Sequence, residues 1–162
     1  MLLFAALAAA AVVDRIEAVV GARIVTASDV AFEAEFDPHD ESPLPALERA
    51  DYGIRERLVD FAVVRSLAGD IEVFRPGGQE VLGRWERFRA SWDPPEGYAA
   101  FLGRWGMDDE DLKGFLYSRL VVEHYVARNL AALAARDRGA GVDPYPGWIA
   151  DLRARVRIRF PR

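Results

Sequence analysis

The sequence predicts a mainly α-helical fold of the α+β class, in which a small antiparallel β-sheet packs on a bundle of about five helices. Apolar and polar side chains alternate near both ends of the chain, at 16–26 and at 154–160, which is typical of half-buried strands. In the middle of the chain, apolar residues instead recur at helical spacing. Because an isolated hairpin is marginal in water, we expect the C-terminal strand to join the edge of an N-terminal β-hairpin.

The composition is that of a single globular domain. The chain has 162 residues, of which 51% are hydrophobic and 29% are charged. Its formal net charge of -5 argues against sequence-independent binding of nucleic acid, which requires many cations to neutralise phosphates. The chain contains no cysteine, which excludes disulfides, thiolate catalysis and cysteine-based zinc sites within it.

The run MLLFAALAAAA, at 1–11, is apolar and too short to span a bilayer as a helix. It is typical of a secretory signal peptide, although no Lys or Arg precedes it. We expect cleavage near Ala9 to Ala11, export across the inner membrane, and a mature single domain at 12–162 that is not a transmembrane protein. The alternative is a buried N-terminal helix, because Ala-rich runs also form helices well.

The folded part of the chain is predicted to begin with the β-hairpin. Alternation indicates a strand at 16–20, and a tight turn at Gly21 leads into a second strand at 23–26. Ser28 is the predicted N-cap of a short helix. A polar, proline-rich loop at 37–45 follows it.

Most of the remaining chain is predicted to be helical, because its apolar residues recur every three to four positions. These helices are expected at about 45–68, around 81–88, at 98–105 and at 108–133. Gly53 lies inside the first of them, Asp108 caps the last, and the stretch IEVF at 71–74 is predicted to be extended.

The segment 147–160 is predicted to complete the domain with a short helix at 148–152 and a final strand. In that strand, apolar residues alternate with arginines: Ala154, Val156, Ile158 and Phe160 with Arg153, Arg155, Arg157 and Arg159. We expect the arginines on the solvent face of an edge strand, where they hinder aggregation and pair with Asp14 or Glu17.

No residue pattern in the chain predicts a catalytic, metal or cofactor site. His39 lies among the acidic residues of the loop FDPHDE, but its spacing matches no metal-binding loop, so we expect this loop to be solvated. Glu123 and His124 are predicted to be a surface pair. We expect no serine to have a nearby histidine that would serve as its base.

Four segments, taken in order, resemble SurA-type periplasmic chaperones. They are VVDRIEAVVGARIVTASDV at 12–30, LVDFAVVRSLAGDIEVF at 58–74, YAAFLGRWGMDDEDLKGFLYSRLVVEHYV at 98–126 and GWIADLRARVRIRF at 147–160. The family carries one or two parvulin-type prolyl-isomerase domains between the long helix and the C-terminal segment, whereas here about ten residues, Asp137 to Pro146, occupy that place, too few for a domain. The chain also lacks the His and Cys residues of a parvulin active site, since it has only His39 and His124 and no cysteine.

The resemblance therefore implies a chaperone module without isomerase activity, which binds unfolded or outer-membrane protein segments in the periplasm. It implies a groove lined by apolar and aromatic side chains, and the candidates are Trp85, Phe88, Trp92, Tyr98, Phe101 and Trp105. The alternative for each of them is a place in the core, because helical apolar spacing is the ordinary sign of a core. A dedicated accessory module for one envelope partner is the alternative function, and an isomerase whose catalytic domain is missing from this sequence is a third.

Overall fold

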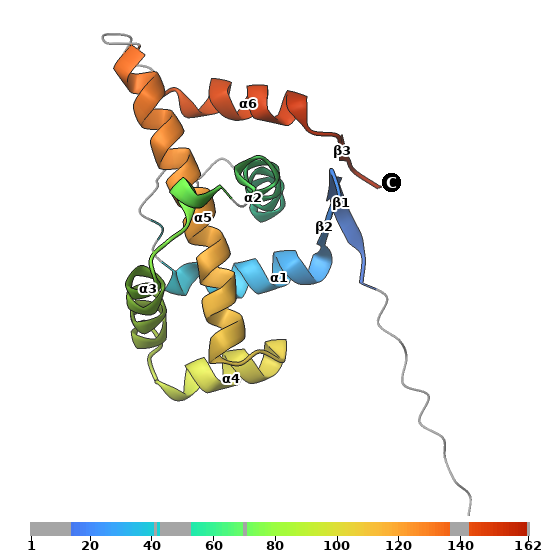
Figure 1. Ribbon diagram of the computed structural model, residues 1–162. Helices are drawn as coiled ribbons and strands as arrows, with labels where there is room; N and C mark the ends of the chain where they lie inside the picture. Colours follow the sequence, from blue (N-terminus) through green and yellow to red (C-terminus); the bar gives the residue numbers. More distant parts are fainter. Residues whose placement is uncertain (1–13, 41, 43–52, 70, 137–142, 162) are drawn as a thin grey trace, which may run out of the picture.

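The computed structural model describes residues 14–40, 42, 53–69, 71–136 and 143–161 (Figure 1). These residues form six α-helices and a small three-stranded antiparallel sheet, which confirms the predicted fold class. The predicted signal peptide at 1–11 lies outside the described residues, as do residues 137–142 before the C-terminal segment. Among the described residues, none of the helices combines the length and the apolar character that crossing a membrane requires.

The sheet joins the two ends of the chain, as predicted. Its strands are β1 (Ile16–Val20), β2 (Arg23–Thr26) and β3 (Ile158–Arg159), in the order β2-β1-β3. Val20 lies opposite Ile158, and the backbone N–H of Gly21 donates to the carbonyl of Arg157 at 2.9 Å. Gly21 has a φ of 59°, a left-handed conformation that glycine adopts at little cost in this tight turn.

The helices surround one long central helix. In chain order they are α1 (Ala27–Phe36), α2 (Ile54–Ala68), α3 (Gly78–Ala90), α4 (Glu96–Trp105), α5 (Asp109–Arg136) and α6 (Tyr145–Arg155), with single 3-10 turns η1 (Asp37–His39) and η3 (Glu72–Phe74). Figure 1 shows α5 as the axis, with α4 beside its first turns and α6 crossing back toward the sheet. α5 packs on both α2 and α3.

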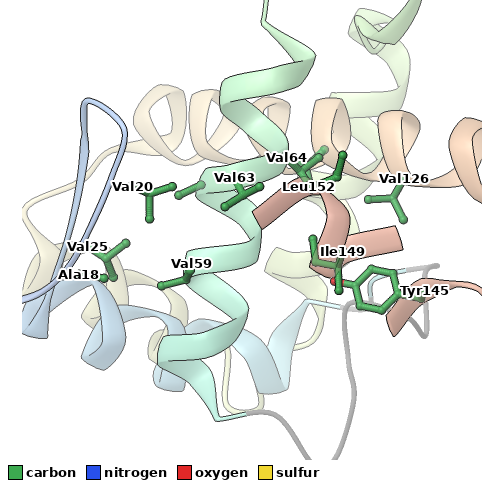
Figure 2. Packing of buried hydrophobic residues seen from close by; sticks show 12 residues of the cluster. Ala18, Val20, Val25, Val59, Val63, Val64, Val126, Tyr145, Ile149 and Leu152 are labelled. Atoms are coloured by element: carbon green, nitrogen blue, oxygen red, sulfur yellow. The ribbon is translucent and has the colours of Figure 1, made fainter. Parts of the chain in front are cut away.

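The core has two main parts. One part lies where the inner face of the sheet meets α2, α5 and α6 (Figure 2), and it includes Ala18, Val20, Val25, Val59, Val63, Val64, Val126, Tyr145, Ile149 and Leu152. The other part is aromatic and lies between α1, α3, α4 and α5, where Phe36, Phe88 and Phe101 are all almost fully buried. Burial of each large apolar side chain contributes about 1.5–3 kcal/mol to stability.

The third strand is shorter than the predicted 154–160, because α6 continues through Arg155. The last turn of α6 is held on α2 by Arg153, whose Nε donates to Asp60 Oδ1 at 2.5 Å. The prediction of an arginine row on one strand is therefore wrong for Arg153 and Arg155, which are helical. The predicted partners are occupied locally: Asp14 accepts from the N–H of Ser28, and Glu17 accepts from Arg15.

The first helix begins earlier than predicted, because its N-cap is Thr26 and not Ser28. Thr26 Oγ1 accepts from the N–H of Asp29 at 3.2 Å, and Asp29 Oδ2 accepts from the N–H of Thr26 at 2.8 Å. This reciprocal capping box satisfies two backbone donors at once, which a serine at position 28 does not do here. The predicted cap of the longest helix is confirmed, since Asp108 Oδ1 accepts from the backbone of Glu110 and Asp111.

Two smaller predictions about the chain around α2 are corrected. Gly53 is the extended N-cap of this helix and not an interior residue, while 45–52 lies outside the described residues. The stretch 71–74 contains η3 where an extended segment was expected. This turn places Phe74 in the core, where its ring lies 5.0 Å from that of Tyr125.

Candidate functional site: an apolar pocket beside an edge strand

The aromatic residues that the sequence offered as a contact surface divide into two groups. Phe88, Tyr98 and Phe101 are buried, with exposed fractions of 1%, 8% and 0%, so for these three the core interpretation holds. Their rings pack on α1 and α5 through neighbours such as Phe36 and Leu116. They offer no surface to a polypeptide.

The three tryptophans of the same set are half-buried, and two of them have bound indole N–H groups. Trp85 Nε1 donates to Tyr98 Oη at 2.9 Å, and Trp105 Nε1 donates to Glu35 Oε2 at 2.9 Å. Trp92 stacks on the ring of His39, with centroids 3.6 Å apart. The tryptophans thus lie at the rim of the aromatic core.

The structure forms a pocket at another place, between β2, α1, α2 and α5, and none of the predicted aromatic residues lines it. Its volume is about 280 Å³. It is lined by Arg23, Ile24 and Val25 of β2, Asp29, Phe32 and Glu33 of α1, Leu58, Phe61, Ala62 and Arg65 of α2, and Phe115, Ser118, Arg119 and Val122 of α5. Each helix contributes residues three or four positions apart, which lie on one helix face and make the walls mostly apolar.

One side of this pocket is an edge strand. In the sheet order β2-β1-β3, β2 has β1 on one side and no other strand of the described residues on its outer side. Ile24, in the middle of β2, is 55% exposed although its side chain is apolar. An exposed strand edge carries backbone N–H and C=O groups that pair readily with another extended chain.

The deep side of the pocket carries a buried ion pair between α1 and α5. Arg119 Nη1 donates to Glu33 Oε1 at 2.6 Å, and the two residues are only 5% and 1% exposed. The guanidinium of Arg119 also lies 4.8 Å from the ring centre of Phe61 and 4.9 Å from that of Phe36. Glu33 and Asp40 raise the pKa of Arg119 against the effect of burial, so its charge is retained.

The ion pair is one end of a buried charge network. Arg119 Nε lies 3.1 Å from Asp40 Oδ2, and Asp40 Oδ1 accepts from Arg84 Nε at 2.5 Å. Arg84 Nη2 reaches Glu123 Oε1 at 3.3 Å, and Ser42 Oγ donates to the same oxygen at 3.1 Å. Burial raises the pKa of Glu123, against the opposite effect of Arg84. The network connects α1, α3 and α5 through side chains far apart in the sequence.

Two predictions about acidic residues are therefore wrong. Asp40 belongs to the loop expected to be solvated, but it is 4% exposed, and Asp37 of the same loop accepts two hydrogen bonds from Arg57. Glu123 was expected on the surface but is 2% exposed, whereas the adjacent His124 is half-buried and bonds to Glu80. Each of these carboxylates can be buried because the guanidinium of an arginine supplies the opposite charge.

The expectation that no serine lies near a histidine is also wrong, because Ser91 Oγ is 3.1 Å from His39 Nδ1. This pair is not arranged as an activated nucleophile. The single hydroxyl proton of Ser91 is donated to the carbonyl of Phe88 at 2.7 Å, so the hydroxyl accepts from the ring N–H of His39. In an activated serine, the hydroxyl donates to the imidazole instead. Within the described ranges, no group of three or more acidic or histidine side chains is placed to hold a metal ion.

The pocket was not predicted from the sequence, although some of the residue patterns that form it were present. Leu58 and Phe61 belong to the apolar pattern that predicts the helix at about 45–68, but that pattern does not reveal which part of the helix face borders a pocket. Glu33 and Arg119 interrupt apolar helix faces, and a charged residue at a core position is a sign of a buried pair. Their 86-residue separation hides the pairing.

Comparisons of this chain with protein-family models, with curated proteins and with solved structures found no match. The resemblance to SurA-type chaperones therefore stays a prediction from the order of the four segments.

Proposed function

We propose that this protein is a periplasmic, chaperone-like protein that binds unfolded or outer-membrane polypeptide segments and has no prolyl-isomerase activity. The pocket between β2, α1, α2 and α5 is the observation that supports the proposal most directly. It combines mostly apolar walls with a strand edge that pairs with no other strand of the described residues, and the two features suit a polypeptide in its extended, unfolded form. Backbone pairing tolerates many sequences, which is what a chaperone requires.

The size of the pocket indicates how a client would be held. Pockets that enclose drug-sized molecules measure about 300–1,000 Å³, so a volume of about 280 Å³ suits a side chain and not a compact ligand. A long segment would lie across the opening and insert one side chain at a time. Such binding is weak for each site and depends mainly on apolar contact, so it should vary little with salt concentration.

A dedicated module for one envelope partner is the second candidate, and the buried ion pair favours it. Glu33 and Arg119 place a fixed, buried ion pair in the lining of a pocket whose walls are mostly apolar. Polar groups at fixed positions select among ligands, because a ligand that leaves them unpaired loses affinity. The two candidates differ in breadth: a chaperone acts on unrelated clients, and a dedicated module acts on one.

Light scattering from an unfolded outer-membrane β-barrel protein tests the proposal, with a proline-peptide isomerisation assay beside it. The wild-type protein should slow client aggregation and leave isomerisation at its uncatalysed rate, which takes tens to hundreds of seconds. Ile24→Glu should weaken the protection, because Ile24 lies on β2 at the pocket. Val73→Glu is a matched control, since Val73 is 54% exposed and Ile24 is 55% exposed.

Three outcomes would change the proposal. Catalysed isomerisation would contradict the absence of enzyme activity. No effect on aggregation at several-fold excess over the client would favour the dedicated partner module. Equal loss of protection in both variants would show that the pocket is not the contact surface.

A further inference from the structure

A second pocket lies between η1 and α3, and it shares no lining residue with the pocket beside β2. Its volume is about 330 Å³, which has room for a small oxyanion and several waters, since a water in the liquid occupies about 30 Å³. Polar side chains come from both sides of it: His39 and Asp40 from η1 and its C-cap, and Arg84, Arg87 and Ser91 from α3 and its C-cap. Its ligand therefore does not depend on the proposed binding of polypeptides.

Arg87 gives this second pocket a positive charge that no carboxylate of the described residues neutralises. The residue is exposed, lines the pocket, and forms no hydrogen bond or ion pair within the described ranges. The acidic side chain of the described lining, Asp40, is already compensated. Its Oδ1 accepts from Arg84 Nε at 2.5 Å, and its Oδ2 lies 3.1 Å from Arg119 Nε. The remaining cation therefore favours an anion in the pocket.

His39 adds a hydrogen-bond acceptor from the η1 side. Its Nδ1–H donates to Ser91 Oγ at 3.1 Å, because the hydroxyl proton of Ser91 is donated to the carbonyl of Phe88. In the neutral ring this arrangement makes Nε2 an acceptor. Nε2 has no partner among the described residues, and it is not one of the polar atoms enclosed away from solvent. The ring itself is fixed by stacking on Trp92, with centroids 3.6 Å apart.

We propose that this second pocket binds inorganic phosphate, whose charged oxygens accept from the Arg87 guanidinium while its P–O–H group donates to His39 Nε2. Near neutral pH inorganic phosphate carries both charged oxygens and at least one hydroxyl, so it complements the cation and the acceptor together. Hydrogen bonds from a guanidinium to phosphate oxygens are short and strong. Sulfate has a similar shape but no hydroxyl, and a phosphate monoester is largely a dianion without one at pH 8.

A titration with inorganic phosphate at pH 8, followed by proton NMR, tests where the ion binds, because the chain has only two histidines. Chloride keeps the ionic strength constant. The ring signals of His39 should shift and saturate, whereas those of His124, which bonds to Glu80 outside the pocket, should stay in place. His39→Phe keeps an aromatic ring at Trp92 and assigns the signals, because only those of His124 remain. Equal shifts of both histidines, or no shift of His39, would overturn the proposal.

Arg87→Gln tests the cation. Loss of the charged donor should weaken phosphate binding about tenfold in isothermal titration calorimetry. Arg128→Gln is the matched control, because Arg128 is also exposed and without an ion pair among the described residues, but it lies on α5 outside the pocket. The control should bind phosphate as the wild type does. An equal loss of affinity in the two variants would show a general effect of charge and would contradict the site.

Sulfate and methyl phosphate test the acceptor at pH 8. Because neither supplies a hydroxyl to His39 Nε2, both should bind the wild-type protein about tenfold more weakly than inorganic phosphate. In His39→Phe, phosphate and sulfate should bind with equal affinity. Equal affinity in the wild type would overturn the role of His39, and tighter binding of methyl phosphate would show that the pocket takes the phosphate group of a larger molecule instead. Suppressed client aggregation without phosphate binding would leave the proposed function standing.

Discussion

Arg119 is the residue on which the pocket and the core depend together. Its guanidinium contacts Glu33 and Asp40, and it lies against the rings of Phe36 and Phe61. Without this cation, two carboxylates would remain buried with less compensation, and desolvated charges of this kind are costly. The residue therefore stabilises the region because its partners are already buried, and not because an ion pair is intrinsically strong.

Arg119→Met should lower the free energy of unfolding by about 3–5 kcal/mol, the usual result of removing one partner from a buried ion pair. Urea denaturation followed by circular dichroism measures this change. Arg104→Met is the matched control, because Arg104 pairs with Glu35 on the surface and is 60% exposed. The control substitution should lower the free energy of unfolding by at most about 1 kcal/mol. Similar losses in the two variants would contradict the account of the network.

Glu123 should make stability depend on pH in a defined direction. Burial raises its pKa above the ordinary value of 4.5, so the folded state binds this proton more tightly than the unfolded state. The folded state then loses stability as the pH rises from 4.5 through the raised pKa. Glu123→Gln has no such proton to lose. The free energy of unfolding of the variant, relative to the wild type, should therefore increase between pH 4 and pH 8 in urea titrations. If this difference in the free energy of unfolding stays constant or decreases over the same pH range, the raised pKa of Glu123 is contradicted.

Residue patterns predicted some of these environments and not others. Phe88 and Phe101 were candidates for the contact surface, and the alternative that their helical spacing offered, a place in the core, is the one that the structure shows. The buried pairs could not be predicted in the same way. Glu33 and Arg119 are 86 residues apart, and only the packing of α1 on α5 brings their charges together. Local sequence favours a solvated side chain for such residues, and the fold overrides that preference.

At the scale of elements, the C-terminal segment completes two separate surfaces. α6 covers the core with Ile149 and Leu152, which are 1% and 3% exposed, and β3 pairs with β1. Phe160, which the sequence placed on the buried face of the strand, is 52% exposed and lies near Arg55. The contribution of this segment to stability therefore comes mainly from the helix, with the strand fixing its end.

Removal of residues 147–162 should destabilise the whole domain by several kcal/mol, at roughly 1.5–3 kcal/mol for each large side chain lost from the core. This loss is comparable to the total stability of a typical domain. Thermal denaturation should show a strongly lowered Tm or no cooperative transition. Removal of only residues 161–162 leaves α6 and β3 in place, and its Tm should match the parent protein. A parental Tm in the longer truncation would show that the two ends are not coupled.

The boundary between α6 and β3 shows where sequence patterns are insufficient. Alternation of apolar residues and arginines predicts a strand from Ala154, but α6 extends to Arg155. The buried Leu152 and the bond from Arg153 to Asp60 stabilise one more helical turn. Only two residues then remain for the ladder with β1. The existence, order and pairing of the elements were predictable, because they follow from the apolar pattern, whereas this boundary depends on a contact with another helix.

At the scale of the whole molecule, the aromatic core and the pocket have different roles. The central side chains of the aromatic cluster between α1, α3, α4 and α5 are buried, and two of its rim tryptophans donate hydrogen bonds to neighbours. The pocket beside β2 is bordered by a strand edge that pairs with no other strand of the described residues. Phe32 and Phe115 connect the two, since they line the pocket and pack against the aromatic cluster. The core thus supports one wall of the surface that we propose to bind clients.

Site-specific photo-crosslinking to an unfolded outer-membrane β-barrel client tests this central claim most directly. A photoreactive phenylalanine analogue replaces Ile24 in one variant and Val73 in the other, two positions whose exposed fractions of 55% and 54% are nearly equal. The Ile24 position should yield crosslinked client, because it lies on β2 at the pocket, and the Val73 position should yield little. Equal crosslinking at both positions, or crosslinking at Val73 alone, would contradict the proposal that unfolded polypeptide binds at the pocket beside β2.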